Sequence, residues 1–139
     1  MELKDALNYQ LETSAQQVDK VLEGLAEDKW GAKLRDESMS PAEVVAHLTE
    51  CYIAAQKELK GEPHEWGSYV PADDSPNALV AAMRAERKKA CDAITAKSDE
   101  ESVKAATQYI VLHDAYHVGQ LATLRLSVDP SWDAYSIYG

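Results

Sequence analysis

Apolar residues recur at steps of three and four along most of the chain, which is the spacing of amphipathic helices. Prolines and glycines divide this pattern into four stretches, at about 2–25, 41–60, 76–95 and 98–128. No stretch alternates apolar and polar residues between hairpin turns, so the sequence predicts no strand. We therefore predict an all-α fold, a four-helix bundle formed by residues 1–139 as a single domain.

Three of the predicted helices begin at a serine, a residue type that caps helix N-termini. Ser40 stands before a proline and three residues before Glu43, which is the pattern of a capping box. Ser75 likewise stands before a proline. Ser98 and Glu101 form a second candidate capping box, so we expect the last helix to begin there.

The inner stripe of the last predicted helix contains histidines where a bundle would place leucines. The members of this stripe are Val103, Ala106, Ile110, His113, His117, Leu121 and Leu124. The corresponding stripe of the second helix contains His47 and, one turn later, Cys51. A buried imidazole needs a polar partner or a metal, so these histidines are the first candidates for function.

Composition and charge narrow the classes of partner. Asp and Glu number 24 against 14 Lys and Arg, and the resulting formal charge of −10 repels phosphate backbones and anionic lipids. We therefore expect no nucleic-acid and no membrane partner. Cys51 and Cys91 lack CxxC spacing, which predicts reduced thiols. No long apolar run occurs, at the N-terminus or elsewhere, so we expect a cytoplasmic protein.

The spacing of the histidines suits one metal ion. His113 and His117 are one helical turn apart, so their Cβ atoms lie about 5–6 Å from each other on one face. His47, from the stripe of a neighbouring helix, would supply a third imidazole. Three ligands that leave a position for water are typical of a catalytic metal site. The alternative, in which the histidines are core residues with polar partners of their own, stays open at this point.

Other residues near these positions have weaker assignments. Cys51 is expected to line the pocket as a buried thiol, and its alternative is a thiolate ligand. His64 is expected to be a solvated loop residue, unless its loop folds back over the site. Glu50 is the candidate for proton transfer or for support of a ligand, since Glu43 is expected to be used in the helix cap. We expect Gly119 to permit close packing or to keep the approach to the site open.

Two segments, MSPAEVVAHLTECY and HDAYHVGQLATLR, together resemble the motif helices of the DinB/YfiT-like superfamily. The resemblance implies a four-helix bundle in which one histidine of the second helix and an HxxxH of the last helix bind a divalent metal. These positions are His47, His113 and His117 here, and the Gly-Gln of the family pattern matches Gly119 and Gln120. Relatives in the family are often homodimers, so a second copy of the chain is a candidate partner.

The resemblance also implies a class of activity. Relatives include metal-dependent enzymes that act with low-molecular-weight thiols, such as bacillithiol transferases and mycothiol-dependent maleylpyruvate isomerase. An iron-binding branch carries HxxxHxE, whereas Gly119 occupies the last position here, which argues against sulfoxide-synthase chemistry. We predict a thiol-dependent transferase or hydrolase for a small molecule, with a low-molecular-weight thiol as cosubstrate and zinc or nickel at the three histidines. The alternative is a non-catalytic metal-binding or dimerising bundle.

Overall fold

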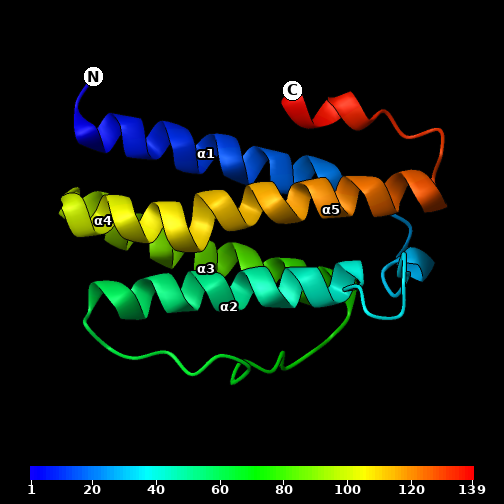
Figure 1. The fold of residues 1–139 in the computed structure, drawn as a ribbon, viewed down its shortest axis with the longest axis horizontal. Coiled ribbons are helices and arrows are strands. Elements are labelled where there is room, and N and C mark those ends of the chain that lie inside the picture. The colour runs from blue at the N-terminus through cyan, green and yellow to red at the C-terminus, as the bar shows by residue number, and fades with distance from the viewer.

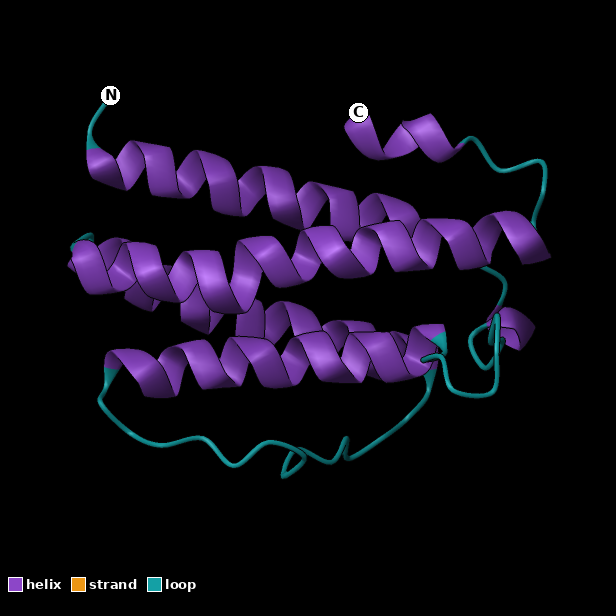
Figure 2. Ribbon diagram, viewed as in Figure 1, coloured by secondary structure: helices purple, strands orange, loops and turns teal.

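The structure, a computed structural model, describes all residues, 1–139, and consists of helices and loops. Figure 2 shows no strand, in agreement with the assigned elements. The α-helices are α1 (Leu3–Leu22), α2 (Pro41–Leu59), α3 (Pro76–Lys97), α4 (Glu100–Ala105) and α5 (Leu112–Val128). The other helical segments are the 3₁₀ turns Glu27–Lys29 and Ala134–Tyr138 and the π-helical turn η2, Ala106–Val111. Because α4, η2 and α5 form one continuous rod, the molecule is an all-α bundle of four rods, which confirms the predicted fold class (Figure 1).

The order of the helices places a long connection beside α2. α2 and α3 run in the same direction, opposite to α1 and α5, so the chain returns along the length of α2 before α3 begins (Figure 1). Residues 60–75 make this crossover. This connection therefore lies along the side of the bundle and not over its end (Figure 1). His64 and Trp66 consequently come close to the middle of α2 rather than to its end.

The core lies where the stripes of the helices meet. α1 packs on α5, and α2 packs on α3. The predicted stripe of α1 is buried from Leu7 to Leu22, while Leu3 is exposed and the helix ends before Leu25. Gly24 accounts for that end, because its φ of +73° is a left-handed conformation that glycine adopts without strain. The largest side chains of the core include Tyr52, Leu48, Met83, Ile94 and Ile110.

The helix starts follow the sequence in part. Ser40 caps α2, because its Oγ accepts a hydrogen bond from the backbone N–H of Glu43 at 3.2 Å. The fourth rod does not begin at the predicted capping box. Ser98 adopts a left-handed conformation that ends α3, and the Asp99 side chain caps α4 by accepting from the N–H of Ser102 at 2.9 Å. Aspartate caps helices as well as serine does, so the sequence does not show which of the two adjacent residues begins the helix.

None of the helices combines the length and the apolar character that a membrane span requires.

Candidate metal centre

The three predicted histidines come together on one side of the bundle. His47 projects from the middle of α2, and His113 and His117 project from α5. The ring centroid of His47 lies 5.8 Å from that of His113 and 5.1 Å from that of His117. The two rings of α5 are 6.3 Å apart. Residues more than sixty positions apart in sequence therefore form one imidazole cluster.

Cys51 belongs to the same cluster. Its Sγ lies 3.6 Å from the Nε2 of His47, one helical turn earlier. One ligand atom each from His47, Cys51 and His113 can be chosen so that all three lie within 4.8 Å of one another. The predicted ligand His117 is not part of this closest group, although its ring lies 5.1 Å from that of His47. The sulfur is thus placed among the candidate donors, close enough for a metal ion held by His47 and His113 to reach it.

Two of the imidazoles are oriented by oxygen atoms. The Nδ1 of His113 lies 2.6 Å from the backbone carbonyl oxygen of Gln108, and the Nδ1 of His117 lies 2.8 Å from the side-chain oxygen of Gln120. A carbonyl oxygen only accepts hydrogen bonds, so each Nδ1 carries the proton and each Nε2 keeps a free lone pair. Metal-binding histidines are oriented in this way by their outer nitrogen. Gln120 thereby gains a role that the sequence alone did not indicate.

The π-helical turn η2, residues 106–111, explains how a backbone carbonyl becomes available to His113. Leu112 donates its N–H to the carbonyl of Thr107, five residues earlier, rather than to that of Gln108. The Gln108 carbonyl accepts the Nδ1–H of His113. Turns of this kind occur often at functional sites, and a prediction of continuous α-helix from 98 to 128 missed this one.

The buried side of α5 differs from the predicted stripe. After Ile110 the fully buried position is Asp114, four residues later, and not His113, which the predicted stripe contains. His113 is half-buried at the edge of the helix, and His117 is buried. Both imidazoles therefore lie at the boundary between the core and solvent, where a ligand can reach them.

Burial sets the protonation of the cluster. The pKa values of His47 and His117 are lowered, first by removal of the rings from water and then by the neighbouring imidazoles. Neutral imidazoles are the form that binds metal. Burial raises the pKa of Cys51 to about 12, and the negative charges of Asp114 and Glu50 add to this effect. In the metal-free protein Cys51 is therefore a thiol.

The cluster opens to solvent through a shallow depression of about 490 Å³. Its lining residues are His47, Gln108, Leu112, His113, Tyr116 and His117. None of these is a carboxylate, although the chain carries a net charge of −10. Gly119 follows His117 by two residues, and a Cβ atom added to it would have no other atom within 4 Å. Close packing is therefore the wrong explanation for this glycine, and an unobstructed surface is the remaining one.

Glu50 and His64 lie beside the cluster and contact each other. The Nε2 of His64 is 3.0 Å from Oε1 of Glu50, and the backbone N–H of Gly67 donates to the same oxygen at 2.7 Å. Burial opposes ionisation of Glu50, but the hydrogen bonds from His64 and Gly67 outweigh it and lower its pKa. The expectation of a solvated His64 is wrong, since only 7% of its side chain is exposed. A role of Glu50 in proton transfer stays a prediction.

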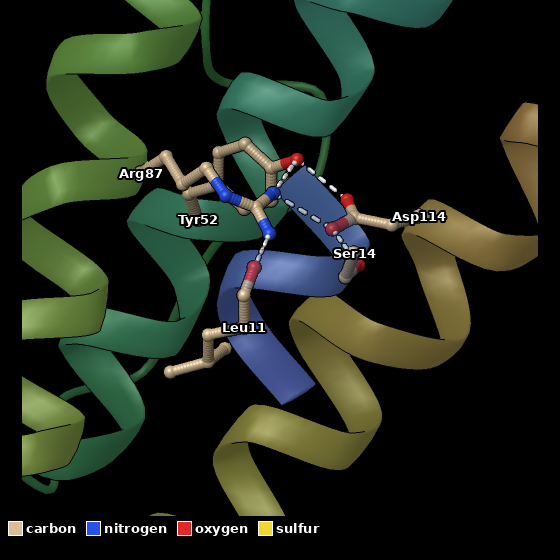
Figure 3. Close-up of polar contacts among 5 residues, drawn as sticks. All are labelled: Leu11, Ser14, Tyr52, Arg87 and Asp114. Carbon is tan, nitrogen blue, oxygen red and sulfur yellow. Dashed lines mark hydrogen bonds and ion pairs between the residues drawn. The ribbon is translucent and has the colours of Figure 1, made fainter. Parts of the chain in front are cut away.

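A buried polar network holds the other face of α5 in place (Figure 3). Asp114 accepts hydrogen bonds from Ser14 of α1 and from the hydroxyl of Tyr52 of α2, the latter at 2.5 Å. Arg87 of α3 donates from Nη1 to Asp114 at 2.7 Å and from Nη2 to the carbonyl of Leu11 at 2.9 Å. Asp114 stands between His113 and His117 in sequence, so the network fixes the rotation of the helix that presents both imidazoles.

Comparison with known proteins is consistent with this arrangement. The family model described as the DinB superfamily matches residues 10–121, a segment that runs from α1 into α5 and includes His47, His113 and His117. No curated protein and no solved structure matches the chain. The matched segment covers most of the sequence and contains all four rods of the bundle, in part or in full. The chain therefore belongs to the DinB superfamily.

Proposed function

We propose that the chain binds one divalent metal ion through His47, His113 and His117. The observation that carries this proposal is the orientation of the two histidines of α5, whose Nδ1 atoms are hydrogen-bonded to oxygens and whose Nε2 atoms are free. Lowered pKa values at His47 and His117 keep two of the imidazoles in the form that binds metal. Imidazole ligands favour zinc or nickel over magnesium or calcium, so zinc or nickel is the proposed ion.

We further propose that the protein is a metal-dependent enzyme, a thiol-dependent transferase or a hydrolase that acts on a small molecule. A metal bound here would lower the pKa of a bound thiol or water, or polarise an electrophile. The side chain of Gln120 and the backbone carbonyl of Gln108 hold two ligand imidazoles in place, and the open depression admits a substrate beside them. An open position of this kind is what distinguishes a catalytic site from a structural one.

The position of Cys51 favours a second candidate function. If its sulfur joined the three histidines, the site would have four protein ligands and would be closed, as structural zinc sites are. The protein would then be a non-catalytic metal-binding bundle. A homodimer, which relatives often form, is compatible with either function and stays a prediction.

Replacement of Cys51 by alanine separates the two candidates. We expect Cys51→Ala to keep one metal ion per chain with less than about a threefold loss of affinity, because three imidazoles suffice for a site that leaves one position open. A competition titration with a chromogenic zinc chelator measures this affinity. A loss of more than about a hundredfold would indicate a fourth ligand and would favour the structural function.

His64→Ala is expected to leave metal content unchanged. The Nε2 of His64 is occupied by Glu50, so it is not free to bind a metal. Elemental analysis of the purified variant checks this expectation. A metal content well below that of the wild type would place His64 in the site and would require the crossover to be a part of it.

The enzymatic proposal is tested with a fluorogenic electrophile, monochlorobimane, and a low-molecular-weight thiol such as cysteine or bacillithiol. The thiolate sulfur forms a bond to the chloromethyl carbon, chloride leaves, and the thiol proton passes to solvent. We expect the zinc- or nickel-loaded wild type to accelerate this transfer, or else the hydrolysis of 4-nitrophenyl acetate. The chelator-treated wild type should not, and neither should His113→Ala incubated with the same metal. Full occupancy without acceleration of either reaction would favour the non-catalytic bundle.

A further inference from the structure

The crossover is fastened to α2 next to the metal centre. The buried carboxylate of Glu50 accepts hydrogen bonds from His64 and from the backbone of Gly67, so two anchors flank Trp66. The anchored segment is short, and both contacts lie at hydrogen-bond distance. The indole of Trp66 is therefore held in one place rather than carried on a free loop.

The indole of Trp66, a residue of the crossover, lies close to two histidines. Its ring centroid is 6.2 Å from that of His47 and 4.8 Å from that of His64, which it meets edge to face. It also stacks against Tyr109 of the π-helical turn, with 6.4 Å between centroids and 22° between ring planes. Despite these contacts, 52% of Trp66 is exposed. A fixed aromatic side chain that is half in water offers surface to a ligand.

Trp66 does not itself line the depression and approaches the cluster at His47, whereas two apolar side chains do line it. Leu112 and Tyr116 line it and are 59% and 69% exposed. Tyr116 meets the ring of His117 edge to face, with 4.9 Å between centroids. Two large exposed apolar side chains therefore line the depression, Trp66 lies beside His47 at 6.2 Å between ring centroids, and no charged side chain lines the depression. An apolar rim around a few polar groups is the usual composition of a small-molecule site.

We propose that the substrate of this site carries a planar aromatic group, which lies against Trp66, and a head group that binds the metal. Trp66 is then a specificity-determining residue, and Glu50 and His64 position it. This inference rests on the proposed metal function, because the head group needs an ion held by His47, His113 and His117. A compact hydrophilic substrate would gain nothing from the apolar rim.

The test uses two hydroxamates that share a metal-binding head. Benzohydroxamate carries a phenyl ring, and acetohydroxamate carries a methyl group in its place. Titration calorimetry with the zinc-loaded protein measures both dissociation constants. We expect benzohydroxamate to bind roughly tenfold more tightly, since an aromatic contact with area burial is worth about that factor. In Trp66→Ala the ratio of the two dissociation constants should fall to within about twofold.

Two further variants make the result specific. Trp66→Phe keeps an aromatic face and should keep most of the preference. Tyr9→Ala removes an aromatic residue that is 66% exposed on α1 and absent from the lining of the depression, and it should behave as the wild type. Circular dichroism shows whether each variant is folded.

The outcomes distinguish the two proposals. If zinc and acetohydroxamate bind but benzohydroxamate has no advantage in the wild type, the aromatic substrate class is wrong and the metal function stands. If the preference survives in Trp66→Ala, Trp66 is not the determinant and the inference fails. If the wild type takes up no zinc, the metal function fails and the inference fails with it.

Discussion

Arg87→Ala is expected to lower the free energy of unfolding by about 3–5 kcal/mol, because it leaves a buried carboxylate without its cation. Asp114 is 1% exposed and Arg87 is 8% exposed. The alanine variant keeps only the hydroxyls of Ser14 and Tyr52 as partners of Asp114 and also frees the carbonyl of Leu11. Removing one member of a buried ion pair costs far more than the pair contributes as a whole. Equilibrium unfolding in urea measures the difference.

A neighbouring arginine provides the matched control. Arg84 lies almost one turn earlier on α3 and pairs with Asp19 at 3.1 Å, but 62% of its side chain is exposed. Exposed ion pairs of this kind contribute less than about 1 kcal/mol, so Arg84→Ala should change stability little. If the two variants lost similar, small amounts of stability, the network around Asp114 would not be the element that fixes α5.

Zinc or nickel is expected to raise the thermal midpoint of the metal-free protein at pH 7.5 by on the order of 10 °C. Metal at a hundred times its dissociation constant stabilises the native state by about 2.7 kcal/mol, and a chain of this length gains a few degrees for each kcal/mol. The unfolded chain cannot offer the same site, since His47 and His113 are far apart in sequence. His113→Ala should abolish the shift. The metal-free bundle itself should stay folded on its apolar core.

The shift should shrink at pH 5.5. Protons compete with metal for the imidazoles, whose reference pKa is about 6.5. The pKa values of His47 and His117 are lowered in the folded state, so the unfolded chain binds more protons between these values and 6.5. The metal-free protein should therefore lose stability as pH falls through this window. A metal-dependent shift of equal size at both pH values would show that the ion binds elsewhere, at groups that do not titrate there.

The sequence predicted the bundle because its signals are local and periodic. The stripe of α1 and the start of α2 at Ser40 depend on spacing and on one cap, and both are confirmed. The one-residue shift from Ser98 to Asp99 at the start of α4 was not predictable, because serine and aspartate cap helices equally well. Which of two adjacent capping residues begins a helix depends on tertiary packing.

The candidate site could be predicted only as far as its histidines. Two imidazoles on an apolar stripe are visible in the sequence, whereas the π-helical turn that frees the Gln108 carbonyl depends on packing across the bundle. The sequence of the crossover does not indicate that His64 contacts Glu50. For the network of Asp114 one signal was present, since Ser14 is a polar residue on the apolar stripe of α1. Its partners come from other helices, which periodicity alone cannot bring together.

The metal content of untagged protein, purified without chelator and measured by elemental analysis, tests the three-histidine site most directly. We expect about one zinc or nickel ion per wild-type chain. Substitution of alanine for His47, His113 or His117 should each reduce occupancy severely, because two imidazoles form a much weaker site than three. Cys51→Ala, which removes the adjacent sulfur, should retain the metal. Equal metal content in the wild type and all three histidine variants would contradict the proposed site.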